Sequence, residues 1–413
     1  MKETKPALVI LNQMAGPLTW ELAEDIGREL GQVALLTGHP DTLAKGGDER
    51  VNLFPAPPYQ RGTYARRVFS WLLYLVRAFF WMWRWPARTP VLLFSNPPML
   101  AWLGYLMWML RGQRYAVMVH DIYPDLLVRL GAISESHAVA RIWRWLNRKS
   151  YEHAEMVMTL GEYMSATLSR SFDPLRTRAG RIEVVYPWAD TEAILPRAKS
   201  ENWFAQEHGQ VDKLTVMYSG NMGLGHDIET MLEAAERLRD EPRIHFMFIG
   251  SGPKWQVVEE WIRTKRLANI TLLPWQSDSV VPYSLATADL ALVSLEEEMA
   301  GLAVPSKAFS SLAAGVPLVV VCSRESELAS LIKRFDCGRM IHPGQAEELT
   351  AMLCGLVADP RGLAHLKGQS RRAAEKIGSR ANSHAFVNII NHVLLAGKVS
   401  ARDAQPESRK AAV

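Results

Sequence analysis

Three short segments in the second half of the chain combine glycine, proline and polar residues in a way that suits anion binding. Gly220-Asn221-Met222-Gly223 and Gly250-Ser251-Gly252 each follow an apolar run, and Val304-Pro305-Ser306-Lys307 precedes a helical pattern. Glycine lets a phosphate approach the backbone, and free amide groups at the start of a helix point toward it. Taken singly, each glycine segment is equally well explained by a tight turn. Together they predict an anion-binding cradle made of Gly220, Asn221, Gly223, Gly250, Gly252, Val304, Pro305 and Ser306.

Lys307 is the only charged residue of these three segments. If Pro305 opens the helix, this lysine lies in the first turn, where a cation opposes the helix dipole. A bound anion would remove that conflict, so we predict that Lys307 balances the anion. A solvent-facing lysine that is tolerated at a small cost is the alternative.

Two further polar segments follow predicted strands. His120-Asp121 comes after the apolar run 115–119, and a neutral imidazole beside a carboxylate can orient a ligand hydroxyl group. The same dipeptide also occurs as a buried hydrogen-bonded pair. Glu325-Ser326-Glu327 could accept hydrogen bonds from ligand hydroxyl groups or could cap the next helix.

Short apolar runs that alternate with helical patterns must position these residues. The runs are 7–11, 32–36, 91–94, 115–119, 156–159 and 182–186 in the first half, and 214–218, 245–249, 270–273, 290–293, 317–321 and 338–341 in the second. Alternation of this kind predicts parallel sheets with helices on both faces. The two series predict an α/β protein of two doubly wound, Rossmann-like domains that face a central cleft, where the strand ends bind ligands.

The boundary between the domains is predicted in residues 191–212, which are polar and contain no strand of their own. We expect an N-terminal domain at 1–195, a C-terminal domain at 196–382, a helix at 383–397 that crosses back, and a disordered tail at 398–413.

Composition limits the class of protein. The chain has 413 residues, of which 48% are hydrophobic and 22% charged, so it is long enough for two cores. Its three cysteines, Cys322, Cys337 and Cys354, do not suit a disulfide framework or a zinc site, and no metal site is expected. The apolar run near the start is too short for a signal peptide, so a cytoplasmic location is predicted.

Residues 51–120 contain eight arginines, six tryptophans and no Asp or Glu. Arginine and tryptophan without acidic residues are typical of a surface that meets anionic lipid headgroups. We predict a membrane-facing region over residues 60–112, with an interfacial helix at 64–85. A core helix, a membrane span interrupted by Arg77, and a single-stranded nucleic-acid surface are the alternatives. The predicted membrane contacts are Arg66, Arg67, Trp71, Trp81, Trp83, Arg84 and Trp85.

The order of motifs His-Asp-x-Tyr-Pro-Asp, Tyr-Ser-Gly-Asn, Gly-Ser-Gly-Pro, Pro-Ser-Lys and Ala-Ala-Gly-x-Pro resembles the retaining glycosyltransferases of family 4, which have the GT-B fold. The resemblance runs from about residue 8 to about residue 395 and is greatest to the branch that builds bacterial surface polysaccharides. It implies a nucleotide-sugar donor, expected to be UDP-linked, bound by the second domain without an essential metal or cofactor. It also implies an acceptor on the first domain.

The resemblance assigns roles residue by residue. His120, Asp121 and Lys307 would be catalytic, with His120 touching the donor sugar and Lys307 neutralising the departing diphosphate. The cradle residues would bind the donor together with Gly16, Pro274, Trp275 and Glu327, of which Pro274 and Trp275 would meet the nucleobase and Glu327 the ribose. With the basic aromatic region, this favours a lipid-linked acceptor, such as a polyprenyl diphosphate sugar, and a peripheral position on the cytoplasmic face of the inner membrane.

The chain departs from the family pattern at four positions. Asn221 stands where many relatives have arginine, Leu224 stands about where they have lysine, and Leu302 and Ser310 replace two glutamates. The phosphate charge would therefore rest on Lys307 and on amide groups. A non-catalytic partner subunit and a GT-B epimerase remain alternatives. A nicotinamide-dependent oxidoreductase is disfavoured, because no Gly-x-Gly-x-x-Gly follows the first strand.

Overall fold

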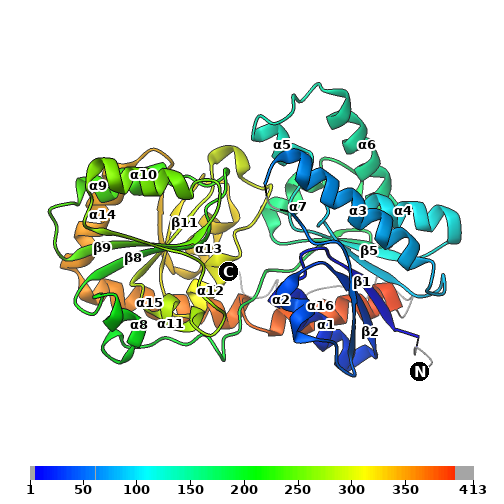
Figure 1. The fold of residues 1–413 in the computed structure, drawn as a ribbon, viewed down its shortest axis with the longest axis horizontal. Coiled ribbons are helices and arrows are strands. Elements are labelled where there is room, and N and C mark those ends of the chain that lie inside the picture. The colour runs from blue at the N-terminus through cyan, green and yellow to red at the C-terminus, as the bar shows by residue number, and fades with distance from the viewer. Residues whose placement is uncertain (1–4, 61, 396–413) are drawn as a thin grey trace, which may run out of the picture.

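The computed structural model describes residues 5–60 and 62–395, which form two α/β domains joined side by side (Figure 1). Domain one contains a parallel seven-stranded sheet in the order β3-β2-β1-β4-β5-β6-β7. Its strands are β1 (Leu8–Leu11), β2 (Val33–Thr37), β3 (Val51–Pro55), β4 (Val91–Phe94), β5 (Tyr115–Val119), β6 (Met156–Thr159) and β7 (Ile182–Val184). Its helices are α1 (Pro17–Leu30), α2 (Pro40–Lys45), α3 (Tyr64–Met82), α4 (Leu100–Arg111), α5 (Asp125–Arg129), α6 (Ala138–Glu152), α7 (Glu162–Leu168) and the 3-10 turn η1 (Pro174–Arg176).

Domain two repeats this plan with a parallel six-stranded sheet in the order β10-β9-β8-β11-β12-β13. Its strands are β8 (Leu214–Asn221), β9 (Ile244–Ser251), β10 (Ile270–Leu273), β11 (Leu290–Ser294), β12 (Leu318–Val321) and β13 (Gly338–Ile341). Its helices are α8 (Trp203–Glu207), α9 (Glu229–Arg237), α10 (Trp255–Lys265), α11 (Val281–Ala286), α12 (Lys307–Ala313), α13 (Glu327–Phe335), α14 (Ala346–Ala358) and α15 (Pro360–Ile377). Two 3-10 turns, η2 (Lys199–Glu201) and η3 (Glu297–Met299), complete it.

The two doubly wound domains confirm the predicted fold class. Strands β4, β5, β6, β10 and β13 have the predicted bounds, and the other predicted strands differ by a few residues at their ends. The sequence prediction missed β3, an edge strand whose residues after Val51 are only partly buried or exposed and which ends at Pro55. Because an edge strand buries less apolar surface, its sequence resembles that of a loop.

Alternation along the strands supplies both faces of the first sheet with apolar side chains. Val9 and Leu11 of β1 belong to the core beneath α3 and α4, whereas Leu8 and Ile10 pack toward α1 and the C-terminal helix. Successive side chains of a strand point to opposite faces, so a fully buried β1 implies helices on both sides. Figure 1 shows α3 and α4 on one side of this sheet and α1 and α16 on the other.

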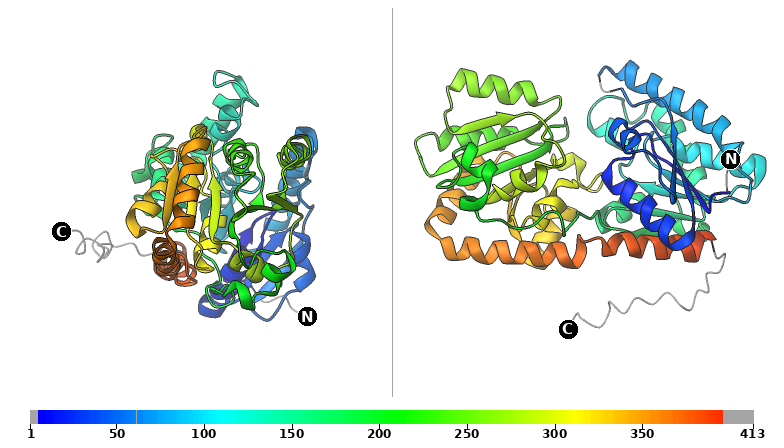
Figure 2. Two further views of the ribbon diagram at one scale, coloured as in Figure 1. Left: turned by 90° about the vertical axis from the view of Figure 1, so that its left-hand side faces the viewer. Right: turned by 60° about the horizontal axis from the view of Figure 1, so that its bottom comes forward.

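The helix α16 (Ala381–Ile390) and the π-turn η4 (Asn391–Leu395) follow α15 and continue from domain two along domain one (Figure 2). Asp25 of α1 is fully buried and accepts hydrogen bonds from Arg380 at 2.9 Å and from the Ser383 hydroxyl at 2.7 Å. The chain therefore crosses back from domain two to domain one over α16 and η4. The predicted disordered tail at 398–413 lies outside the described residues.

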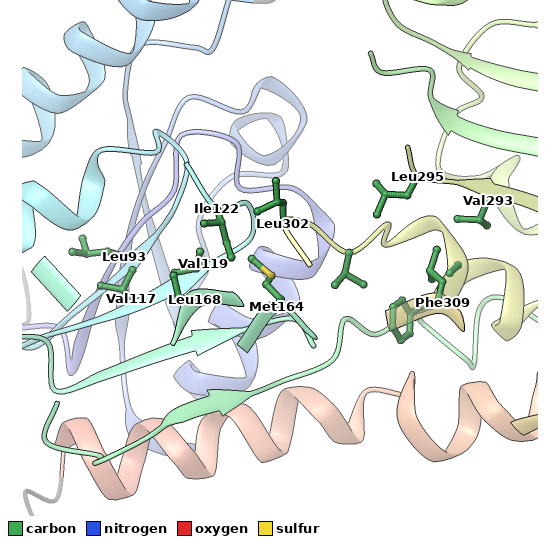
Figure 3. Packing of buried hydrophobic residues seen from close by; sticks show 14 of the residues in the cluster. Leu93, Val117, Val119, Ile122, Met164, Leu168, Val293, Leu295, Leu302 and Phe309 are labelled. Carbon is green, nitrogen blue, oxygen red and sulfur yellow. The ribbon is translucent and has the colours of Figure 1, made fainter. Parts of the chain in front are cut away.

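The two domains also meet at the ends of their sheets. The Ile122 amide donates a hydrogen bond to the Leu302 carbonyl at 3.0 Å, and Asp121 and Ala303 form an isolated antiparallel bridge. Figure 3 shows Ile122 and Leu302 beside Met164, within an apolar cluster that extends into both domains. The loop before α12 is thereby fixed to domain one.

Helix α3 presents one face to the core and the other to solvent. Trp71, Trp81 and Trp85 are buried, and Trp81 contacts Phe54 with ring centroids 5.0 Å apart. The prediction that these three tryptophans face a membrane is therefore wrong, because Trp81 and Trp85 pack on Phe54 of β3 and Trp71 packs between Tyr59 and Tyr123. Trp83, Arg66 and Arg84 are exposed, and Arg67 is partly buried. No helix within 5–60 or 62–395 is long and apolar enough to cross a bilayer.

Candidate active site

A cavity of about 440 Å³ opens where the strands of the second sheet end. It lies at β8, β9 and β11, and β8 and β11 are the neighbours between which the strand order reverses. Such switch points are the places where open parallel sheets bind ligands. Of the predicted site residues, the cavity wall contains Asp121, Gly220, Asn221, Trp275, Val304, Pro305, Ser306 and Lys307.

The glycines of the predicted cradle have different roles. Gly220 has φ +141° and lines the cavity, and a Cβ added there would lie 3.2 Å from Cε of Lys307. Gly250 and Gly252 also have positive φ, but their added Cβ atoms would lie 2.0 Å from the Gly220 carbonyl oxygen and 2.5 Å from that of Met222. They permit close backbone packing between β8 and β9 and are not part of the cavity wall. The prediction that Gly250 and Gly252 contact the donor is therefore not supported.

Gly223 also lies outside the lining residues, in the turn after β8. A Cβ added there would lie 3.1 Å from both Asn221 Nδ2 and His226 Cδ2. Gly223 therefore allows the Asn221 and His226 side chains to approach each other on the cavity side of the turn.

Lys307 is the first residue of α12 and points back across the end of β8. Its ammonium group bonds to the Tyr218 hydroxyl, lies 3.4 Å from the Asn221 carbonyl oxygen and sits 3.8 Å from the centroid of the Tyr218 ring. Within the described part of the chain, no carboxylate forms an ion pair with it. Burial lowers the pKa of Lys307 to about 7, because nothing on the protein compensates its charge. An anion entering the cavity would supply that compensation.

His226 is a cavity residue that the sequence prediction missed. Its Nδ1 lies 2.7 Å from the Ser294 carbonyl oxygen, and burial together with the charge of Lys307 lowers its pKa to about 3. The ring is therefore neutral near pH 7. Its place in a glycine-rich turn gave the only sequence signal, and that signal does not distinguish a ligand contact from a packed side chain.

His120 and Asp121 lie at the end of β5, where a second cavity of about 250 Å³ begins. The His120 amide donates to the Ser95 hydroxyl at 2.8 Å, and its ring meets the edge of Phe94 with centroids 5.3 Å apart. Burial lowers the pKa of His120 to about 4 and raises that of Asp121 to about 6. A neutral imidazole that can exchange hydrogen bonds with a hydroxyl group is thus held at this point.

The second cavity shares part of its wall with the first. Asp121, Val304 and Ser306 line both, so the two spaces adjoin across the domain interface. The rest of the second cavity is mainly apolar, with Tyr186 and Trp188 from the segment after β7. Neither residue was singled out from the sequence.

Glu327 does not reach either cavity. It is the first residue of α13, is only 5% exposed, and accepts a hydrogen bond from the Tyr163 amide of domain one at 3.1 Å. Its carboxylate also bonds to Tyr186, and burial raises its pKa. A Cβ at Gly161 would lie 2.3 Å from Oε2 of Glu327, so any larger residue there would require the Glu327 side chain to move. In this structure the Glu327 carboxylate caps α7 and does not face the cavities, so the geometry does not support the predicted contact with a ribose.

Two other predicted donor residues lie beside the cavities and not in their walls. Gly16 precedes α1, whose Thr19 lines the second cavity, and Pro274 precedes Trp275. Trp275 lines the first cavity and is 50% exposed, and its indole N–H donates to the Ser251 hydroxyl. Ser310 lines the first cavity, whereas Leu302 is buried at the domain interface.

Two family models match the chain. The model described as "Glycosyl transferase 4-like domain" matches residues 15–188, and the model described as "Glycosyl transferases group 1" matches residues 213–359. The first match covers the sheet of domain one from β2 to β7, and the second covers the sheet of domain two.

Curated relatives are similar over part of the chain. The probable glycosyltransferase WbjE of Pseudomonas aeruginosa is 26% identical over 259 residues, which are 63% of this chain and 64% of that protein. The putative colanic acid biosynthesis glycosyl transferase WcaI of Escherichia coli (strain K12) is 27% identical over 253 residues, 59% of this chain and 60% of that protein. Both matches span less than two thirds of the relatives' own length.

Solved structures share the fold over nearly the whole chain. Anabaena HepE in complex with UDP and glucose has a TM-score of 0.71 at 13% identity, covering 93% of this chain and 99% of that chain. WaaG, a glycosyltransferase involved in lipopolysaccharide biosynthesis, has a TM-score of 0.68 at 15% identity, with coverage of 93% and 99%. At such identities the likeness is one of fold.

Proposed function

Because the chain belongs to the family 4 glycosyltransferases of the GT-B fold, in the branch that builds bacterial surface polysaccharides, we propose that it transfers a sugar from a UDP-sugar to a membrane lipid-linked acceptor with retention of configuration. The observation that carries this proposal is Lys307, a cation without an ion-pair partner in the described chain at the switch point of the second sheet. HepE, which has the same fold, was crystallised with UDP, and this supports the choice of nucleotide.

The donor would lie with its diphosphate at Lys307 and the turn after β8. Trp275 at the cavity mouth would stack on the uracil ring, and Gly220 would leave room for a phosphate beside the lysine. The sugar would then point toward Asp121 and His120, where the two cavities adjoin. As the family resemblance implies, no metal or other cofactor is expected in this arrangement.

In a same-face displacement the bond from the sugar to the diphosphate breaks while the acceptor oxygen attacks from the same side. Negative charge grows on the departing oxygen, which takes up the acceptor proton. Groups already aimed at that oxygen stabilise the transition state more than the substrate. Lys307 would have this role, and neutral His120 would accept or donate a hydrogen bond at a sugar hydroxyl without adding charge.

The acceptor is inferred from the outer surface of domain one. Helices α3, α4 and α6 pack against one another on one side of the sheet. Their solvent side exposes large apolar residues, and the one acidic residue in these helices, Glu152, is buried. These exposed residues include Phe69, Leu72, Val76 and Phe80 on α3, Trp83 directly after it, Met109 and Leu110 on α4, and Ile142 and Trp145 on α6.

An apolar surface of this kind, with arginines and no exposed acidic residue on its three helices, suits an anionic bilayer. We therefore propose a peripheral position on the cytoplasmic face of the inner membrane. There the second cavity could receive the sugar of a polyprenyl diphosphate-linked acceptor.

The decisive assay incubates the purified protein with a panel of UDP-sugars and a bacterial lipid extract. The expected result is release of UDP together with a lipid product heavier by one sugar, detected by mass spectrometry, with no effect of a metal chelator. UDP-sugar binding without turnover would support a non-catalytic partner subunit instead. Conversion of the UDP-sugar into an isomer without acceptor would support an epimerase.

A further inference from the structure

His226 presents one bare ring nitrogen to the donor cavity. Its Nδ1 lies 2.7 Å from the Ser294 carbonyl oxygen, and a carbonyl only accepts hydrogen bonds, so Nδ1 carries the hydrogen. In the neutral ring, Nε2 is then an acceptor with a free lone pair. Among the described residues Nε2 has no hydrogen-bond partner, and it is not sealed from the cavity that His226 lines.

Among the charged groups that the structure describes around His226, Lys307 is the one cation without an ion-pair partner. Lys254 bonds to the His226 carbonyl, but its charge is taken up by Glu229 at 2.8 Å and by Glu296 at 3.2 Å. On the other side lie Lys307 of α12 and the uncharged Tyr218 of β8. Asp227, the next residue, is held by the amide and hydroxyl of Thr230.

A diphosphate diester carries two negative charges, whereas the described cavity wall offers Lys307 as its one cation and Asp121 as an acid. A phosphate oxygen that approached bare Nε2 would meet a lone pair, which is repulsive. The same contact becomes a charge-assisted hydrogen bond if the ring is protonated. Burial and Lys307 hold the pKa of His226 at about 3 in the free protein, and a bound anion acts in the opposite direction.

We propose that His226 takes up a proton from solvent when the donor diphosphate binds and becomes its second cationic ligand. This inference rests on the proposed function, because it requires a diphosphate at Lys307. A protonated His226 would supply the positive charge that is missing at Asn221 and Leu224, where many relatives have arginine and lysine. The competing arrangement, in which neutral Nε2 accepts a hydrogen bond from a ligand hydroxyl, involves no proton uptake.

The test uses the β-methyl ester of UDP, which has no sugar to be recognised and whose two phosphates stay fully ionised near pH 6. Calorimetry at pH 6 in buffers of different ionisation enthalpy gives the number of protons taken up on binding. Lys307 and Asp121 also respond to the ligand, so the measured quantity is the difference between wild type and His226→Gln. His245→Gln is the matched control, since burial also lowers the pKa of His245 to about 4, but its ring bonds to Thr271 outside the cavity.

We expect wild type and His245→Gln to take up about one proton more on binding than His226→Gln. As the pH rises from 5.5 to 6.5, the affinity of these two proteins for the ligand should fall about tenfold more per pH unit than that of His226→Gln. Tight binding with equal proton uptake in wild type and His226→Gln would overturn the inference while leaving the donor site intact. Absence of binding to the wild type would overturn the donor assignment, and the inference with it.

Discussion

Lys307 combines burial, a positive charge and a place at the mouth of a ligand cavity. Its contacts are the Tyr218 hydroxyl, the Tyr218 ring and the Asn221 carbonyl, none of which carries a full negative charge. Keeping an uncompensated ammonium group partly buried costs free energy. A negatively charged ligand would compensate the ammonium charge and offset that free-energy cost, which is consistent with a ligand-binding role for Lys307.

Replacement of Lys307 by methionine should lower kcat by about 100- to 1000-fold, the usual effect of removing one preorganised donor to a leaving group. The thermal midpoint should not fall, because no ion pair is lost within the described chain. Lys333→Met, on the exposed side of α13, is the control and should retain turnover. Near-normal turnover in purified Lys307→Met would refute the assigned role.

The same lysine should shape the pH dependence of donor binding. Burial lowers its pKa to about 7, so it is charged below that pH and loses its proton as the pH rises. Donor affinity should therefore fall more steeply above about pH 7 than below it. Titration of binding from pH 5.5 to 8.5 should show this added steepness in wild type and not in Lys307→Met. A slope that stays constant through pH 7 in the wild type would contradict the assignment.

At the scale of residues, the sequence indicated which side chains lie at the strand ends, but it did not indicate which contacts those side chains make across the two domains. Asn221, Ser306 and Lys307 follow strand ends or open a helix, and such positions converge in any parallel sheet. Glu327 was predicted to bind a ligand hydroxyl group, whereas in the structure its carboxylate caps α7, because a helix cap and a hydroxyl acceptor have the same sequence signature. The pairing of Glu327 with Tyr163 depends on how the two domains dock, and no local pattern encodes that.

Helix α3 illustrates what patterning adds to composition. Trp71, Tyr74, Ala78 and Trp81 recur at intervals of three or four residues and are all buried. The sequence prediction treated the tryptophans of this region as one group because of their composition, and so assigned buried rings to the surface. The helical period alone separates the two faces.

Substitutions on the two faces of α3 should affect different properties: one on the buried face should lower stability, and one on the exposed face should lower membrane binding. Trp81→Ala removes a fully buried ring and should destabilise domain one by about 3 to 5 kcal/mol in chemical denaturation. Phe80→Glu changes a side chain that is 65% exposed and should leave stability unchanged. It should, however, lower sedimentation with phosphatidylglycerol vesicles by about tenfold or more, since it removes apolar contact and adds repulsion.

Val211→Glu, at a partly exposed apolar position in the segment before β8, is the matched control and should sediment like the wild type. If Phe80→Glu sediments as well as this control, or if the wild type stays in the supernatant at low salt, α3 does not meet the membrane.

At the scale of the whole molecule, the donor cavity depends on contact between the domains. The backbone contacts at Ile122 and Asp121 hold the loop that precedes Lys307, and Glu327 of domain two caps α7 of domain one. The position of Lys307 is therefore set partly by domain one. A family likeness predicts two facing domains, but not these contacts.

Glu327→Gln should loosen this docking without disturbing either sheet. The amide keeps the shape of the side chain but is a weaker acceptor for the Tyr163 amide. Hydrogen exchange should become faster at the first turn of α7, and the KM for the donor should rise. Glu325→Gln, two residues earlier and exposed, should change neither. Unaltered exchange in α7 would show that the Glu327 carboxylate does not hold the domains together.

The central claim is that the cavity at the switch point of the second sheet binds a nucleoside diphosphate through Lys307. A crystal structure of the protein grown with UDP tests it most directly. The expected result is a β-phosphate oxygen within hydrogen-bond distance of the Lys307 ammonium group and a uracil ring against Trp275. A well-ordered crystal with an empty cavity, or with UDP bound away from Lys307, would contradict the account.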